Sequence, residues 1–217
     1  MKKKVLGSAW PRHFNQVIAE EMYENIREIG LPEWSEADQQ LAKAVQEEVG
    51  SPDNFDGLAT KLDTIRIPTT RFISGGSDDI GDISWKLPTV TMRFPSNIPG
   101  LQGHHWSNAI AMATPIAHKG VIAGAKVEAM TILDFLLQPD KVDAAWAYFK
   151  EEQGMKEEYI PMVTEEDSPA IYLNTEIQEE FREKLEKYYY DENRFDSYLD
   201  QLGVTYPTLR ESEDGGN

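Results

Sequence analysis

The sequence predicts an α/β protein in which part of a mixed or parallel sheet is covered by helices and is followed by a helical extension. Two apolar, β-branched runs near residues 70–74 and 88–94 indicate strands. A helical pattern precedes these strands at 35–49, and another follows them at 117–137. After Pro139 the sequence becomes rich in charged residues. The length of 217 residues allows one large domain or two small ones.

The first expected helices lie at residues 15–29 and 35–49. Apolar side chains of the first recur at helical spacing, and Gly30 follows where a helix would end. These side chains are Ile18, Met22, Ile26 and Ile29. Before the second helix, Ser35 with Asp38 three residues later resembles a capping box, in which each residue's side chain bonds the other's backbone N–H.

The central region predicts strands joined by loops. Arg71-Phe72-Ile73 leads into a glycine-rich acidic loop that continues to Asp82, and residues 88–94 form a second strand that Pro95 ends. We expect the helix at 117–137 to be largely buried, because apolar residues occur on most of its faces.

The region after Pro139 predicts three more helices, at about residues 140–153, 174–190 and 194–202, and then an acidic tail. Apolar side chains recur at helical spacing within a charged background, which is typical of helices on the outside of a protein.

The composition excludes several classes of function. The formal net charge of −17 argues against nucleic acid and anionic membranes as partners, because their phosphates require basic surfaces. Without cysteine, disulfides, thiolate nucleophiles and Cys-ligated zinc are excluded, so any metal must be held by His, Asp or Glu. We expect a cytoplasmic protein, since no signal-like or membrane-spanning apolar segment occurs.

Two features could carry chemistry. His118 lies near the start of a helix, where its ring could face a cleft at the carboxyl edge of a sheet; alternatively, it only caps that helix. In the loop Gly75-Gly76-Ser77-Asp78-Asp79, glycines would let backbone N–H groups approach a ligand, although an ordinary tight turn has the same pattern.

Several segments, taken together and in order, resemble M20-family metallo-amidohydrolases, and within them the aminobenzoyl-glutamate hydrolase (utilization protein B) group. The resemblance covers nearly the whole chain and is strongest toward the C-terminal part of the family. The segments are Asn15 to Gln46, Gly75 to Trp85, Pro88-Thr89-Val90, Gly103-His104-His105-Trp106, Ala117 to Lys126 and Tyr198 to Gly203.

The resemblance implies amide-bond hydrolysis with two divalent metals, zinc or manganese, a bridging water and a glutamate base. His118 occupies the place of the family's last metal ligand. The substrate contacts that the resemblance implies are Gly76, Ser77 and Asp78, with His104 and His105 at the pocket wall. The implied substrate is a small amide of an amino-acid-like group.

The family's other metal ligands and its glutamate base find no counterpart here. Glu20-Glu21 and Glu47-Glu48 lie on the solvated faces of expected helices, and we assign no catalytic residue. The resemblance therefore implies a C-terminal half that is inactive alone and whose site is completed by a missing N-terminal half or a homologous subunit. Intact members of the family are expected to be homo-oligomers.

The implied domains are a remnant of the dimerisation domain at 1–30, the C-terminal part of the catalytic domain at 31–139, and the helical extension with its acidic tail at 140–217. Two alternatives stay open. The chain could be a non-catalytic interaction subunit, or His104, His105 and His118 could form a self-contained mononuclear zinc site.

Overall fold

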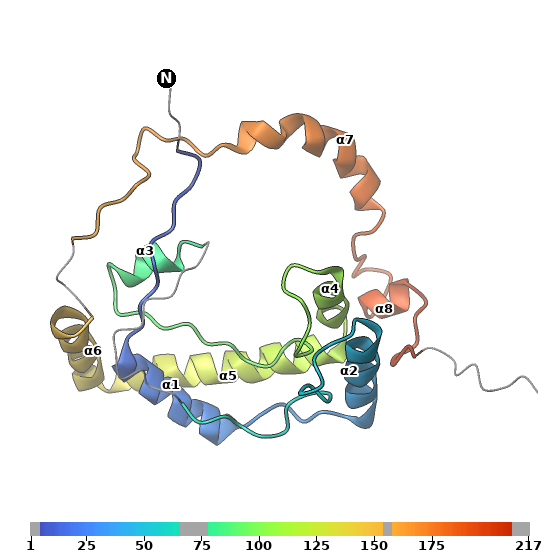
Figure 1. Ribbon diagram of the computed structural model, residues 1–217, viewed down its shortest axis with the longest axis horizontal. Helices are drawn as coiled ribbons and strands as arrows, with labels where there is room; N and C mark the ends of the chain where they lie inside the picture. The colour runs from blue at the N-terminus through green and yellow to red at the C-terminus, as the bar shows by residue number, and fades with distance from the viewer. Residues whose placement is uncertain (1–4, 66–77, 154–157, 210–217) are drawn as a thin grey trace, which may run out of the picture. The chain divides into compact units, whose positions relative to one another are not determined.

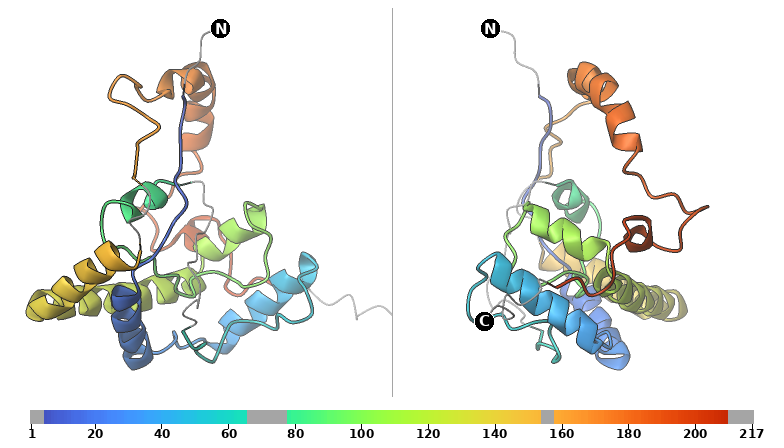
Figure 2. Two further views of the ribbon diagram at one scale, coloured as in Figure 1. Left: turned by 60° about the vertical axis from the view of Figure 1, so that its left-hand side comes forward. Right: turned by 90° about the vertical axis from the view of Figure 1, so that its right-hand side faces the viewer.

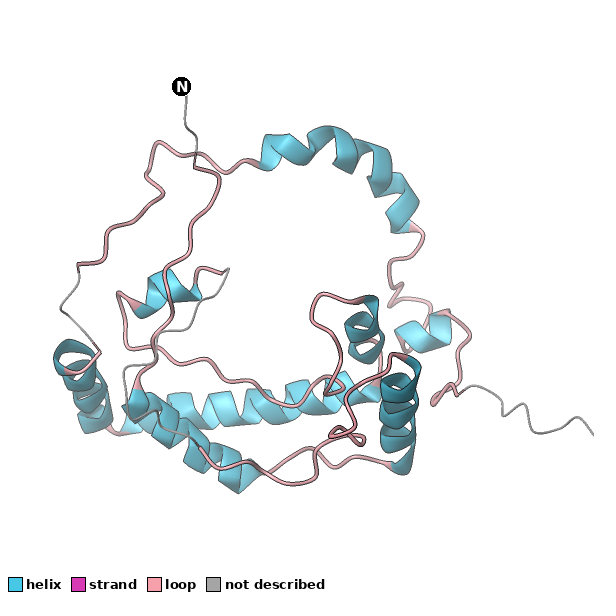
Figure 3. Cartoon of the chain, in the orientation of Figure 1, coloured by secondary structure: helices cyan, strands magenta, loops and turns pink. Residues whose placement is uncertain are grey.

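The computed structural model describes residues 5–65, 78–153 and 158–209. Helices and loops make up these ranges, and no strand occurs among them (Figure 3). The predicted sheet covered by helices is therefore wrong. Residues 88–94 form irregular chain, and 70–74 lie outside the described ranges. In the run 88–94, Pro88 and the following Pro95 have no N–H to donate. β-Branched residues form a strand only where a partner strand can bond their backbone groups.

Most of the predicted helices are confirmed, with shifted ends (Figure 1). The short helices α3 and α4 and the 3-10 turn η1 were not predicted, because each is too short to show a clear period. The elements are α1 (Gln16–Ile29), α2 (Glu36–Glu48), α3 (Ile80–Ser84), α4 (Trp106–Met112), α5 (Pro115–Leu137), α6 (Pro139–Glu151), η1 (Ile171–Asn174), α7 (Thr175–Glu186) and α8 (Tyr198–Gln201).

The ends of α1 and α2 follow their local sequence. Gly30, directly after α1, has a φ of +74°, a left-handed conformation that glycine adopts without steric cost. The predicted capping box before α2 is present: the Ser35 Oγ accepts the Asp38 N–H at 3.2 Å, and the Asp38 Oδ2 accepts the Ser35 N–H at 2.7 Å.

The chain divides into two compact units, each built from three separate stretches. Unit 1 combines Met1–Asn25, Thr64–Met92 and Ala129–Tyr188. Unit 2 combines Ile26–Asp63, Arg93–Glu128 and Tyr189–Asn217. Both α1 and α5 contribute residues to each unit, and α5 is one unbroken helix in every view (Figure 2).

A buried polar cluster organises unit 1. The Gln153 amide joins two buried side chains: its Nε2 donates to His13 Nδ1 at 2.9 Å, and its Oε1 accepts from Asn15 Nδ2 at 2.7 Å. Asn15 also donates to the Ala145 carbonyl at 2.9 Å, which ties the segment before α1 to α6. The Trp85 ring packs edge-on against the His13 ring, with the two ring centroids 4.7 Å apart. The cluster thus connects three stretches that are distant in sequence.

The Gln153→Ala variant should destabilise unit 1 by about 1–3 kcal/mol, because it leaves polar groups of His13 and Asn15 buried without their partner. Urea unfolding followed by circular dichroism measures this change. Gln178→Ala, on an exposed position of α7, is the matched control. Equal midpoints for the two variants would contradict the structural role of the cluster.

An apolar cluster forms the core of unit 2. Its buried members come from α2, from α4 and α5 and from the loops between them, and Trp34, Leu101 and Tyr206 pack against it. Buried Gln46 binds both the N–H and the carbonyl of Gly57 and also donates to the Pro99 carbonyl at 2.9 Å. The buried members are Leu41, Ala42, Val45, Leu58, Ile98, Ala111 and Ile116.

Helix α5 is only partly buried. Ile116 and Val127 are fully enclosed, whereas a set of large apolar side chains on the same helix is more than half exposed. The expectation of a largely buried helix is therefore wrong for this set. No helix in the described ranges is long and apolar enough to cross a membrane. The exposed apolar side chains are Val121, Ile122, Ile132, Leu133, Leu136 and Leu137.

The start of α5 sits close against another backbone segment. A Cβ at Gly120 would collide with the Pro95 carbonyl oxygen and the Ser96 Cα, which are backbone atoms that cannot rotate aside. Only glycine therefore fits at this approach between α5 and the 95–96 loop.

Gly120→Ala should lower the stability of unit 2 by about 1–3 kcal/mol, even though alanine favours helices by about 1 kcal/mol over glycine. The melting temperature measures the effect. Gly103→Ala, at a position with no atom within 4 Å of the added Cβ, is the control. A G120A protein as stable as the wild type would refute the close contact.

Candidate functional site around His118

His118 projects from the first turn of α5 toward solvent. The two residues before it, Ile116 and Ala117, are 0% and 4% exposed, whereas His118 is exposed. Its backbone N–H donates to the Thr114 carbonyl at 3.4 Å, as expected within a helix, and its ring makes no hydrogen bond with the described residues. The described part therefore offers no support for the alternative that the ring caps the helix, and the imidazole is accessible to a ligand.

The residue after His118 is anchored to a buried carboxylate. Lys119 Nζ lies 2.6 Å from Oδ2 of Asp38, whose side chain is 0% exposed. The same oxygen accepts the Ser35 N–H, and the other oxygen, Oδ1, accepts the Tyr206 hydroxyl at 2.6 Å. We call Asp38, Lys119 and Tyr206 the carboxylate cluster. It joins α2, the first turn of α5 and the C-terminal part of unit 2.

The surroundings of Asp38 stabilise its charged form. Burial by itself raises the pKa of Asp38, but hydrogen bonds from Lys119, Tyr206 and Ser35 outweigh burial and hold that pKa below its ordinary value of 3.8. Burial, the hydrogen bond to Asp38 and the negative charge of Asp38 raise the pKa of Tyr206. Asp38 is therefore ionised and Tyr206 is neutral at physiological pH.

Of the expected substrate contacts in the glycine-rich loop, only Asp78 is described; Gly76 and Ser77 lie outside the described residues. Asp78 is half-buried just before α3. Its Oδ1 accepts the Ile80 N–H at 3.3 Å, and its Oδ2 lies 3.7 Å from Arg12 Nη1. Asp78 belongs to unit 1 and His118 to unit 2.

The paired histidines differ in their surroundings. His104 is exposed, with a φ of +57° in the left-handed region. His105 caps α4: its Nδ1 accepts the Ser107 N–H at 3.4 Å and lies 2.9 Å from the Ser107 hydroxyl. Capping occupies one nitrogen of the His105 ring, so only Nε2 is left to meet a ligand.

The described residues do not assemble a metal centre. No group of three or more His, Asp or Glu side chains within these ranges is placed to hold a metal ion. His104, His105 and His118 are all described, so the alternative of a mononuclear three-histidine zinc site is not formed. A divalent metal needs about three protein ligands.

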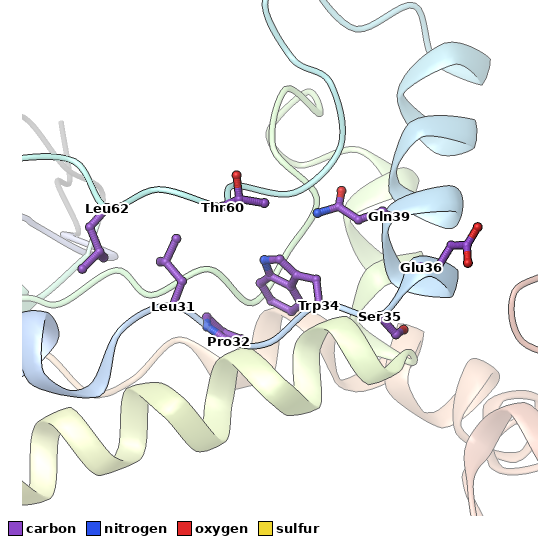
Figure 4. Close-up of a pocket in the computed structure, with 8 residues that line it drawn as sticks. All are labelled: Leu31, Pro32, Trp34, Ser35, Glu36, Gln39, Thr60 and Leu62. Carbon is purple, nitrogen blue, oxygen red and sulfur yellow. The ribbon is translucent and has the colours of Figure 1, made fainter.

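A surface hollow of about 660 Å³ lies beside α2 in unit 2, and none of the predicted site residues lines it (Figure 4). Two of its polar side chains are engaged within the protein. The Trp34 Nε1 donates to the Ala59 carbonyl, and the Gln39 amide bonds both backbone groups of Leu58. The hollow therefore has a wall of mixed apolar and polar side chains. Its lining residues are Leu31, Pro32, Trp34, Ser35, Glu36, Gln39, Thr60 and Leu62.

Sequence reasoning did not identify the carboxylate cluster. Asp38 was recognised only as a capping residue, and nothing in the local patterns links it to Lys119 or to Tyr206. No local signal could have found it, because Lys119 and Tyr206 lie 81 and 168 positions from Asp38 in the sequence.

The chain is similar to a subunit of the p-aminobenzoyl-glutamate hydrolase of Escherichia coli (strain K12), with 29% identity over 144 residues. This match covers 57% of the chain and 30% of the relative, so the chain spans less than a third of that protein's length. No family model and no solved structure matches the chain.

The carboxylate cluster predicts a pH dependence. The pKa of Asp38 is lowered by folding, so its contribution to stability is present above its ordinary value of 3.8 and is lost as the pH falls below that value. We expect the melting temperature of the wild type to approach that of Asp38→Asn as the pH falls below 3.8. A constant difference between the two proteins over this range would contradict the assignment.

Proposed function

We propose that the chain is the C-terminal part of an amide-cleaving hydrolase of the aminobenzoyl-glutamate type, in which His118 supplies one ligand to a divalent metal, zinc or manganese. The similarity to the E. coli hydrolase carries the proposal. The exposed imidazole of His118, on a helix turn whose neighbouring residues are fixed, supports it.

A divalent metal in such a site would polarise the amide carbonyl and lower the pKa of a bound water. His118 would contribute the lone pair of a neutral imidazole nitrogen, while the buried residues beside it keep the ring directed outward.

The remaining ligands and a general base would come from polypeptide outside this chain, either an N-terminal half or a homologous subunit. Support comes from the described residues, which lack a three-ligand cluster, and from the limited share of the relative that the chain spans. We therefore propose that the chain alone turns over a negligible amount of substrate.

The test compares hydrolysis of p-aminobenzoyl-glutamate by the wild type and by His118→Gln, with added zinc or manganese. The chain alone should show no turnover above the variant. With a partner that supplies the missing ligands, the wild type should be active and H118Q should lose at least about 100-fold, because removal of one ligand opens the site. Glu128→Gln, at an exposed position of α5, is the control.

Two outcomes would contradict the proposal. Turnover by the isolated wild type well above that of H118Q would show that the chain holds a complete site. Equal activity of the wild type and H118Q in the presence of the partner would exclude His118 as a metal ligand.

The exposed apolar side chains of α5 favour a second candidate, a non-catalytic subunit that acts through interaction. Val121, Ile122 and Leu136 are 62%, 58% and 71% exposed, and exposed apolar side chains that form a contiguous patch are typical of interaction surfaces. Co-purification with an intact homologue, without any effect on its activity, would support this candidate over the first.

A further inference from the structure

The C-terminal segment of unit 2, residues 189–209, is held together by its own hydrogen bonds. The Gln201 amide accepts the Asp191 N–H at 2.8 Å and donates to the Tyr189 carbonyl at 2.9 Å. The Tyr190 hydroxyl donates to the Phe195 carbonyl at 2.6 Å. The segment therefore keeps its shape through local contacts.

The same segment buries little of itself. None of its residues is buried, and its contact with the core of unit 2 includes the Tyr206 ring. The Tyr206 hydroxyl continues inward and donates to Asp38 Oδ1 at 2.6 Å. A segment with so few buried side chains opens readily unless a strong contact holds it, and a hydrogen bond to a buried carboxylate is such a contact.

Each oxygen of Asp38 holds a donor from a different part of unit 2. Oδ1 meets Tyr206 from the C-terminal segment, and Oδ2 meets Lys119 from the first turn of α5. Since the carboxylate is 0% exposed, water does not replace a lost donor unless the site opens. Loss of the donor at one oxygen therefore lets the carboxylate move. The donor at the other oxygen then loses its fixed partner.

We propose that docking of the C-terminal segment through Tyr206 fixes Asp38 and thereby the first turn of α5. Tyr206, Asp38 and Lys119 are then positioning residues for His118, the neighbour of Lys119 in sequence. The inference rests on the proposed function only in treating His118 as the functional group; the coupling itself belongs to the fold.

Hydrogen exchange followed by mass spectrometry on the full chain tests the coupling. Tyr206→Phe keeps the ring and removes only the hydroxyl that reaches Asp38. Exchange should become about tenfold faster or more in two places, residues 189–209 and residues 115–121, because both depend on the same carboxylate. Tyr190→Phe removes a hydrogen bond within the segment and should speed exchange only in residues 189–209.

A matched pair of variants approaches the same carboxylate from α5. Lys119→Met keeps the aliphatic length and removes the charge, so exchange in residues 115–121 should rise. Lys119→Arg keeps the charge and should stay within about twofold of the wild type. If Y206F speeds exchange throughout unit 2, the comparison of K119M with K119R decides whether residues 115–121 depend on the Asp38 carboxylate.

Unchanged exchange at residues 115–121 in Y206F, with faster exchange confined to residues 189–209, would overturn the coupling. So would equal exchange in K119M and K119R. His118→Gln separates this inference from the proposed function: it should leave exchange in both regions unchanged whether or not His118 binds a metal.

Discussion

The buried carboxylate of Asp38 is the constraint on which unit 2 depends most. A charged group enclosed by protein is tolerated only when its oxygens are satisfied, and here the donors are the Ser35 N–H, the Lys119 ammonium and the Tyr206 hydroxyl. These donors come from three parts of the chain. Satisfying one carboxylate therefore requires α2, α5 and the C-terminal segment to adopt a single arrangement within the unit.

His118 gains its accessibility from this arrangement. Successive residues of a helix point about 100° apart. In this turn of α5 the neighbours of His118 point into the protein, so the His118 side chain points toward solvent. Ile116 and Ala117 are enclosed, Lys119 reaches Asp38, and Gly120 contacts the 95–96 backbone. The imidazole of His118 is therefore exposed on this turn of α5.

Part of the fold followed from local sequence. Helical periodicity, the capping box at Ser35 and the glycine after α1 act over a few residues, and each was confirmed. The expected sheet was wrong because strand formation depends on a partner strand, which a run such as 88–94 does not specify. The expectation that α5 is largely buried was wrong for a similar reason. The apolar composition of a helix does not determine which of its faces are covered by other parts of the chain.

The sequence by itself determined the absence of thiol chemistry and the two helices expected at 15–29 and 35–49, which the structure places at 16–29 and 36–48. Those features depend on side-chain chemistry and on spacing over one or two turns. Only the tertiary structure decided that Asp38, Lys119 and Tyr206 meet and that His104, His105 and His118, the residues of the alternative zinc site, do not form a metal-binding group. Such contacts join residues up to 168 positions apart, and folding alone brings them within hydrogen-bonding distance.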